Sequence, residues 1–287
     1  MAGFFSDPLV QSVLVPVVGG FLLTGAIRIA NGPTRGPLVA GASVGLGFLV
    51  AHGLTLGVPA LPPIAPEQEL AYVVAAGLVI GFLLDFFRRG PLYRETVYLL
   101  GSAAGLYWIA QPLIETGDAW IYLALIALWL GAIIAGYRLE KSRAAGLDSC
   151  LKLLVASLGL GAIAIFGRAT DLGQISFGLA TALGGFALWN WPVNRYNFGA
   201  ALLLGAGGAF IALAYVLALY SETSPIALAL LLLCFFADVA AKRVKLPAGK
   251  FGDALRPFVL VGLALVPALA AIAAAYIQST WVDSTPV

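Results

Sequence analysis

The stretch "LDFFRRGPLYRE" (84–95) gathers five charged side chains between two long apolar runs. Its centre pairs Gly90 with Pro91, a combination that ends one helix and begins another. Apolar runs separated by short charged joints are typical of a chain that crosses a membrane repeatedly. The stretch therefore predicts a turn between two membrane spans. Its charged side chains are also the first candidates for a site.

The composition of the whole chain indicates the same class. Of 287 residues, 61% are hydrophobic and 10% are charged, and the mean hydropathy is +0.98. A soluble domain is typically about 25% charged. So many apolar side chains cannot be hidden in one aqueous core, which predicts a polytopic membrane protein. With a formal net charge of +2 and no basic tract outside the short joints, we expect no nucleic-acid partner.

Ten apolar runs have the length of a membrane span, which is about 20 residues. Proline-rich and glycine-rich joints separate several of them, such as "ANGPTRGP" (30–37) and "GVPALPPIAPEQE" (57–69). The pattern predicts an all-α, polytopic integral membrane helix bundle of about ten transmembrane helices in a single domain, 1–287. The ten predicted spans are 9–29, 37–58, 69–87, 95–114, 118–137, 147–167, 172–192, 197–220, 224–241 and 256–279.

The basic residues predict how the chain threads. If the joint after the first span is cytoplasmic and the spans alternate, cytoplasmic joints hold 15 of the 16 Lys and Arg residues, and the other side holds only Arg168. Short basic joints stay cytoplasmic. Both termini are then expected outside the cytoplasm, and we expect the chain in a bacterial cytoplasmic (inner) membrane. No Lys or Arg precedes Arg28, so we expect the first run to be a span rather than a cleaved signal peptide.

A weak internal similarity divides the chain into two halves. "GAIRIANGPTRG" (25–36) aligns with "GAIAIFGRATDLG" (161–173) with one insertion. Each is followed by a glycine-rich span. If the repeat is real, halves 1–145 and 146–287 have five spans each. An odd number inverts the second half, as is common in secondary transporters.

Small residues and prolines inside the spans indicate how the helices pack. Gly101 and Gly105 form a G-x-x-x-G pattern, which predicts close helix packing, with a passage lined by small residues as the alternative. Pro16 and Pro267 lie within predicted spans. They predict a kink or, alternatively, a broken helix of the kind that binds ions or substrate.

Acidic residues near the cytoplasmic ends of spans are candidates for a site, because charge in a membrane is costly and often functional. Three of them have basic residues three or four positions later, which predicts a local ion pair on the same helix face. These predicted pairs are Asp85 with Arg88 and Arg89, Asp238 with Lys242, and Asp148 with Lys152.

The other candidate binding residues are His52, Glu95 and Arg195. His52, the only histidine, lies deep in the second span and suits either a structural hydrogen bond or proton transfer. Glu95 begins the fourth span, where it could join Asp85 in binding a cation or relaying a proton. Arg195 lies in "WNWPVNRYN" (189–197), which predicts interfacial anchoring or, alternatively, contact with a headgroup or a partner.

Several kinds of chemistry are disfavoured. One histidine and two distant cysteines, Cys150 and Cys234, do not suggest a metal centre, a disulfide framework or a bound cofactor. "GASVG" (41–45) matches G-x-S-x-G, but Ser43 lies in an apolar run that predicts a helix, whereas that motif needs a strand and a sharp turn. No catalytic residues are predicted, and a membrane enzyme that acts on lipid is the third alternative, after the two functions described next.

Span count, the possible inverted repeat and small-residue interiors favour a secondary transporter or permease for a small molecule. The scarcity of charge in the spans favours the alternative, a non-catalytic membrane subunit that packs against partner proteins or lipid. Membrane lipid is an expected partner in both cases. The other partner is then a small-molecule substrate or a set of membrane proteins.

Overall fold

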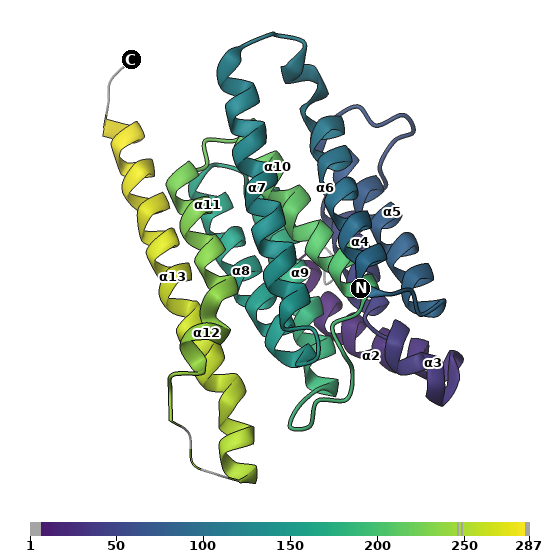
Figure 1. Ribbon diagram of the computed structural model, residues 1–287. Helices are drawn as coiled ribbons and strands as arrows, with labels where there is room; N and C mark the ends of the chain where they lie inside the picture. The colour runs from purple at the N-terminus through teal and green to yellow at the C-terminus, as the bar shows by residue number, and fades with distance from the viewer. Residues whose placement is uncertain (1–6, 246, 248, 285–287) are drawn as a thin grey trace.

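The structure is a computed structural model that describes residues 7–245, 247 and 249–284 (Figure 1). Throughout these residues every regular element is a helix. The predicted all-α bundle is therefore confirmed. The chain ends, 1–6 and 285–287, lie outside the described residues, as do 246 and 248 in the last basic joint.

The helices follow the predicted spans closely. In the first half they are η1 (Val10–Leu14, a π-helical turn), α2 (Val15–Ala30), α3 (Gly32–Val39), α4 (Ala42–Thr55), α5 (Pro66–Phe86), α6 (Pro91–Ile114) and α7 (Ala119–Lys141). In the second half they are α8 (Gly146–Phe166), α9 (Thr170–Trp189), η2 (Leu202–Gly207, also π-helical), α10 (Gly208–Tyr220), α11 (Pro225–Leu231), η3 (Leu232–Phe236, a 3-10 turn), α12 (Ala237–Ala241) and α13 (Lys250–Ser284).

Eight of the described helical segments are long and apolar enough to cross a membrane. A ninth crossing results if α3 and α4, which are bent by 51°, act as one span. The remaining predicted span corresponds to Pro225–Ala241, a 17-residue helix interrupted by η3. Each of the ten predicted spans thus has a helical counterpart. The number of crossings and the five-plus-five repeat stay predictions.

The turn predicted at 88–91 is confirmed. Helix α5 ends at Phe86, and Arg88 adopts a φ of 52°, a left-handed conformation that a helix cannot continue. Pro91 then begins α6, at the first helical position, where a missing backbone N–H costs little. Arg88 and Arg89 therefore lie beyond the helix rather than on its last turn.

The joints gather at two opposite ends of the bundle. At one end Arg88 donates to the carbonyl of Thr34, and Arg143 donates to that of Phe198 at 3.1 Å. At the other end Tyr220 donates to the carbonyl of Ile109. We call the first the basic end, because joints 87–90, 142–145 and 190–199 meet there, together with the described residues 242–245. Figure 1 shows the long helices running between these two ends, and their threading through a membrane stays a prediction.

Helices α8, α9 and the pair η2–α10 form the centre of the bundle. Between 67% and 78% of the residues in their apolar windows are buried, against 22–33% in the other span-length helices. Gly20 of α2 and Gly185 of α9 allow these helices to touch, because a Cβ at either position would collide with the facing backbone. The central helices are not the most apolar ones, since the mean hydropathy is 1.3 for α9 and 2.5 for the outer α13. Lipid is as apolar as a protein interior, so small residues that allow close contact distinguish the centre better than hydropathy does.

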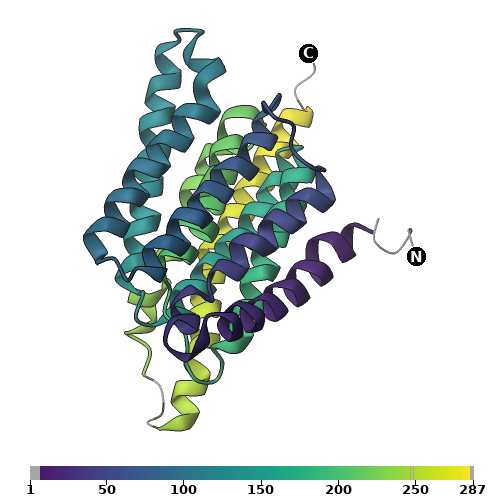
Figure 2. The same cartoon turned by 90° about the vertical axis from the view of Figure 1, so that its right-hand side faces the viewer.

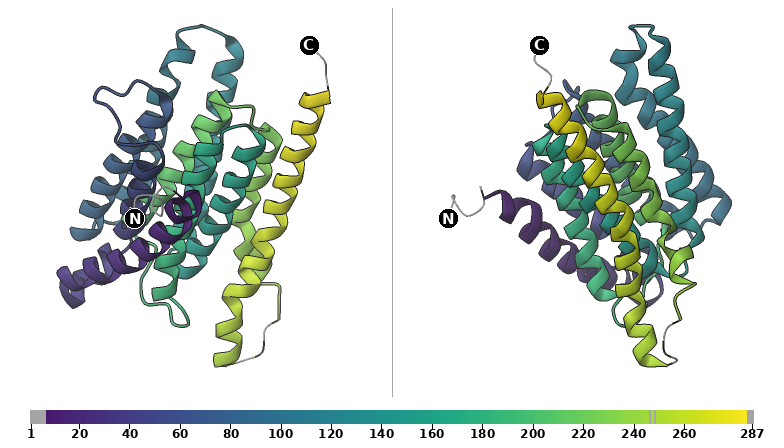
Figure 3. Two further views of the ribbon diagram at one scale, coloured as in Figure 1. Left: turned by 180° about the vertical axis from the view of Figure 1, so that it is seen from behind. Right: turned by 90° about the vertical axis from the view of Figure 1, so that its left-hand side faces the viewer.

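The outer helices differ in how they lie on this centre. Figure 2 shows α2 running obliquely across the bundle and the α6–α7 hairpin extending beyond its neighbours at the end opposite the basic end. Figure 3 shows α13 along the outer edge, where it packs against α8 and α11. Apolar side chains on these outer helices are exposed, which places lipid against them.

The predicted helix breaks lie elsewhere than expected. Pro16 lies where the π-helical η1 passes into α2, in a helix that continues from Val10 to Ala30, and Pro267 lies inside the uninterrupted α13, so neither proline ends a helix. The interruptions occur instead between α3 and α4 and at η3.

Candidate functional site

Three segments meet near the basic end around a break in a helix. They are the last turn of α7, the second turn of α8 and the junction of η3 with α12. Joint 142–145 between α7 and α8 is short, which brings these two helix ends side by side. At Gly146 a Cβ would collide with the carbonyl of Tyr196, so glycine allows the joint 190–199 to close over the start of α8.

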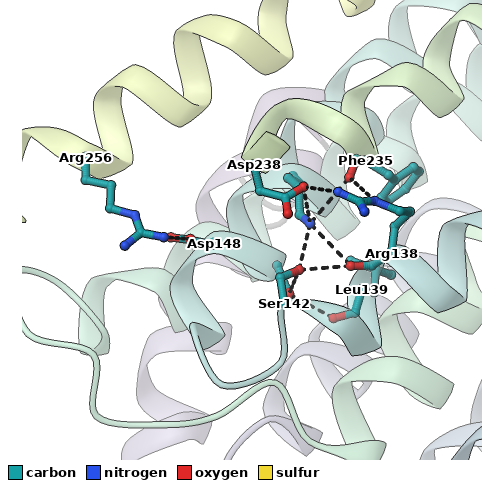
Figure 4. Close-up of polar contacts among 9 residues, drawn as sticks. Arg138, Leu139, Ser142, Asp148, Phe235, Asp238 and Arg256 are labelled. Carbon is teal, nitrogen blue, oxygen red and sulfur yellow. Dashed lines mark hydrogen bonds and ion pairs between the residues drawn. The ribbon is translucent and has the colours of Figure 1, made fainter. Parts of the chain in front are cut away.

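Asp238 of α12 accepts hydrogen bonds from two cations (Figure 4). Its Oδ1 lies 2.6 Å from a terminal nitrogen of Arg138 and 3.3 Å from Nζ of Lys152. All three side chains are buried, and Lys152 is fully enclosed. One carboxylate therefore serves two positive charges contributed by α7 and α8.

The break in the helix supplies a further acceptor. At η3 the winding changes to 3-10, and the carbonyl of Phe235 accepts from Nε of Arg138 at 3.3 Å and from Nζ of Lys152 at 3.4 Å. The guanidinium of Arg138 also lies over the ring of Phe236, 4.6 Å from its centroid. Both cations therefore bind the end of the 3-10 turn as well as the carboxylate that follows it.

Two hydroxyls complete the surroundings of Lys152. Its Nζ donates to Oγ of Ser142 at 2.7 Å and lies 3.4 Å from the carbonyl of Arg138. Ser142 and Ser149 are hydrogen-bonded to each other at 2.8 Å. With Asp238 and Phe235, four oxygen acceptors thus surround an ammonium group that has three protons.

The charges of this cluster do not cancel. Arg138 and Lys152 in their charged forms contribute two positive charges, and Asp238 contributes one negative charge. Lys152 lies six residues into α8, about 9 Å from Gly146 along the helix axis. An excess charge buried at that depth is costly. Loss of one proton from Lys152 would leave a neutral Arg138–Asp238 pair.

A second network lies at the same end. The carboxylate of Asp85 on α5 accepts from the backbone N–H groups of Ala200 and Ala201 at 2.9 and 2.8 Å. These groups begin the helical segment that continues into η2, and a carboxylate there is favoured by both the unpaired donors and the helix dipole. Gly199 is necessary because a Cβ at that position would collide with the Asp85 carboxylate.

Further ion pairs surround these two networks. Arg94 of α6 is paired with Glu140 of α7 at 2.9 Å, and both are largely buried. Arg143 lies in the joint after α7, where burial and the nearby Arg94 lower the pKa of its guanidinium, while Glu140 and Asp85 oppose that shift. The four charges of Asp85, Arg94, Glu140 and Arg143 sum to zero, unlike those around Lys152.

The predicted local ion pairs are wrong. Asp85 binds the backbone of Ala200 and Ala201, since Arg88 and Arg89 lie beyond the end of its helix. The partners of Asp238 are Arg138 and Lys152 rather than Lys242. Lys152 is paired with Asp238. Asp148 pairs instead with Arg256 at 2.8 Å (Figure 4). In each case a partner from a distant segment replaces the one on the same helix.

The remaining predicted site residues lie apart. His52 is buried toward the opposite end, where its Nε2 bonds to the carbonyl of Glu67 at 2.9 Å, which supports its structural reading. Glu95 is exposed on α6, and the buried neighbour is Arg94. Arg195 is also exposed, and its backbone N–H donates to the side chain of Asn190. Asp85 and Asp238 are the two predicted residues that belong to buried networks at the basic end.

Sequence reasoning missed Arg138 and Lys152 as a pair. A lysine six residues inside a predicted span was an available signal, but the nearby Asp148 offered a simpler partner. Ser43, in the G-x-S-x-G match, is buried in α4 and hydrogen-bonded to Thr24 at 2.7 Å, which is a helix-packing contact. Helix α4 begins at Ala42, inside this motif, and the segment before it is helix α3 rather than a strand, so the strand–turn–helix that the hydrolase motif needs is not formed there.

These helices define the chain as a polytopic integral membrane protein with lipid-facing apolar helices. No protein-family model matches the chain, and no curated protein matches it.

Proposed function

We propose that the chain is a secondary transporter for a small molecule, and that Lys152 carries the proton that drives transport. The observation that carries this proposal is the buried cluster of Lys152, Arg138 and Asp238 at the η3 break, with its one excess positive charge. In many secondary transporters, interrupted helices offer free carbonyls to a coupling ion. Here the ammonium of Lys152 occupies that position on the carbonyl of Phe235.

Protonation of Lys152 and the shape of the helix are then linked. With its proton, Lys152 holds the carbonyl of Phe235, Asp238 and the end of α7 together. Without it, Arg138 and Asp238 remain as a neutral pair, and the uncharged amine has two N–H donors instead of three for its four acceptors, which weakens this junction. A proton thus favours one arrangement of α12 against α7 and α8 over another. A ligand can shift such an equilibrium only through differential binding to the two states.

The placement in the membrane extends the proposal. With the basic end in the cytoplasm, Lys152 exchanges its proton near the cytoplasmic surface, and both chain ends lie outside the cytoplasm of a bacterial inner membrane. Support comes from the sequence count of 15 Lys and Arg residues out of 16 in joints of one side. The halves 1–145 and 146–287 are the units that would rock against each other.

Hydrogen–deuterium exchange of the purified protein in lipid nanodiscs tests the proton switch without a known substrate. Peptides from 232–241 are followed between pH 5 and pH 9, after correction for the intrinsic exchange rate. We expect protection in this segment to fall as Lys152 loses its proton, and Lys152→Met to remove that pH dependence. The matched control is Lys245→Met, an exposed lysine at the same end. Corrected exchange that is independent of pH in the native protein would rule out the switch.

Transport itself is tested in proteoliposomes that enclose a pH-sensitive dye. A panel of amino acids, sugars, organic acids and lipophilic amines is added outside, and acidification or alkalinisation of the interior is recorded. We expect at least one class to move protons in the native protein and not in Lys152→Met. A dye response that is equal in these two proteins would exclude Lys152 as the coupling group.

One observation favours the second candidate, a non-catalytic membrane subunit. The carboxylates of Asp85, Asp148 and Glu140 all have internal partners, as structural groups do. Purification from native membranes after mild crosslinking distinguishes the two candidates. A stoichiometric partner without proton movement favours the subunit.

A further inference from the structure

Two cavities flank the α6–α7 hairpin, and helix α10 forms the floor of both. The first, of about 280 Å³, lies between α5, α6 and α10. The second, of about 230 Å³, lies between α7, α10 and α11. Ile211 and Tyr215 of α10 line both cavities. The floor of one cavity is therefore continuous with the floor of the other.

The first cavity opens sideways, toward lipid. Its lining includes Ala76 and Ile80 of α5 and Gly101 and Trp108 of α6, which are all exposed, and Ala76 and Gly101 lie near the middle of their helices. Exposed positions at mid-span face the hydrocarbon of the bilayer. A molecule dissolved in the membrane can thus reach this cavity without passing through water.

Open space, rather than close helix contact, surrounds two of the lining glycines. A Cβ built on Gly101 or Gly208 meets no atom within 4 Å. Gly101 was predicted to pack against a neighbouring helix, and the structure contradicts that expectation. Its partner in the motif, Gly105, does approach Val73 of α5. The absence of side chains at 101 and 208 therefore keeps the cavity open.

Tyr215 gives the cavity one distinctive polar group. Its side chain is buried, with 2% exposed, and its hydroxyl has no hydrogen-bond partner among the described residues. The nearby Tyr98 differs, because its hydroxyl donates to the carbonyl of Ala132 at 3.0 Å. Buried hydroxyls are nearly always paired, and hydrocarbon cannot supply a partner. Tyr215 therefore lines the apolar cavity and has, close to that lining, a buried hydroxyl with no hydrogen-bond partner among the described residues.

We infer that this cavity binds an uncharged lipophilic molecule whose oxygen accepts a hydrogen bond from Tyr215. Among the described residues that line it, none is charged, and aromatic and aliphatic side chains predominate. Its volume is close to the lower end of the range of ligand pockets, roughly 300–1,000 Å³. The ligand enters between α5 and α6 from the bilayer. This binding site goes beyond the proposed transport and does not require it.

Photolabelling in nanodiscs tests the inference with two probes of equal chain length. One is a diazirine-bearing fatty-acid methyl ester, which has a carbonyl acceptor, and the other is a diazirine-bearing alkane without oxygen. We expect the ester to label peptides of α5, α6 and α10 about 3- to 10-fold more than the alkane, the gain of one hydrogen bond. Tyr215→Phe should make the two probes equal. Gly101→Val should reduce labelling by the ester.

Two variants serve as matched controls. Tyr107→Phe alters an exposed tyrosine on the lipid face of α6, and Gly262→Val alters a helical glycine of α13 whose Cβ also meets open space. Both should label like the native protein. Equal labelling by ester and alkane in the native protein overturns the inference, because it indicates ordinary lipid contact. An ester preference that survives Tyr215→Phe also overturns it.

Folding and transport are kept separate from binding. Variants are compared only where they elute from size-exclusion chromatography as the native protein does. If Tyr215→Phe does not fold, the test relies on Gly101→Val. Labelling of Gly101→Val by the ester that equals labelling of the native protein then overturns the inference. An ester preference in a protein that moves no protons would count against the proposed transport and leave this site intact.

Discussion

Nζ of Lys152 lies 3.3 Å from Oδ1 of Asp238, although 86 positions separate the two residues in the chain. The contact joins α8 to the short helix α12, and Arg138 of α7 shares the same carboxylate oxygen. Three helices are therefore held at the basic end by one acidic side chain. The stability of the protein should therefore depend more on Asp238 than on Lys152, and substitutions can measure this difference.

Asp238→Asn should destabilise the protein strongly. The substitution leaves Arg138 and Lys152 buried without a counter-charge, and breaking a buried pair in this way costs about 3–5 kcal/mol of unfolding free energy. Lys152→Met should cost much less, because the neutral Arg138–Asp238 pair survives. Thermal unfolding of the purified variants in detergent, followed by circular dichroism, measures both effects.

The control for this prediction is Lys242→Met. Lys242 is the basic residue four positions after Asp238, and a local ion pair would make it the important partner. Because the structure gives that role to Lys152, Lys242→Met should stay within about 0.5 kcal/mol of the native protein. A loss at Lys242 as large as that at Asp238 would show that the local pair exists after all.

Much of the fold was readable from the sequence, because length and hydropathy alone determine which runs cross a bilayer. All ten apolar runs became helical segments, and the joint at 88–91 became a turn. Pro91 was equally informative, since a proline acts within a few residues of where it lies, whereas the left-handed conformation falls on Arg88 rather than on Gly90 and was not predicted. Local rules of this kind need no knowledge of which helices are neighbours.

The ion pairs of the site depend on which helices are neighbours, and most of them were not predicted from the sequence. Asp85 and Asp238 were identified as candidates, but their partners were sought on the same helix. The real partners come from α7, α8 and the start of η2, and only the packing of helices brings these together. The prediction of close helix packing at Gly101 was wrong for the same reason, since a G-x-x-x-G pattern does not specify whether a helix or a cavity faces it.

Asp85→Asn should weaken the start of the η2–α10 segment. The carboxylate accepts from two backbone N–H groups, at Ala200 and Ala201, and an amide oxygen can replace it only in part. We expect a loss of about 1–3 kcal/mol in unfolding free energy. Arg88→Ala, which would break the local pair predicted from sequence, should have little effect. Urea or thermal unfolding of both variants decides between the two partners.

Gly185→Ala should disrupt the packing of α9 against α2. A Cβ at this position collides with the backbone around Val17 and Gly20, and backbone cannot move aside as a flexible side chain can. Overpacking of this kind costs about 1–3 kcal/mol. Gly262→Ala on α13 meets open space and should be neutral or slightly stabilising, because alanine favours the helix. A lower yield and melting temperature for Gly185→Ala alone would agree with this packing.

The orientation of the bundle can be tested with introduced cysteines, since the two native ones, Cys150 and Cys234, are fully buried. Thr116→Cys places a thiol at the tip of the α6–α7 hairpin, and Arg195→Cys places one in an exposed joint at the basic end. Basic joints are retained in the cytoplasm. In intact cells a membrane-impermeant maleimide should therefore label Thr116→Cys and not Arg195→Cys, and permeabilised cells should show labelling of both. The reverse pattern would place the basic end outside, and the proton of Lys152 would then exchange on the opposite side of the membrane.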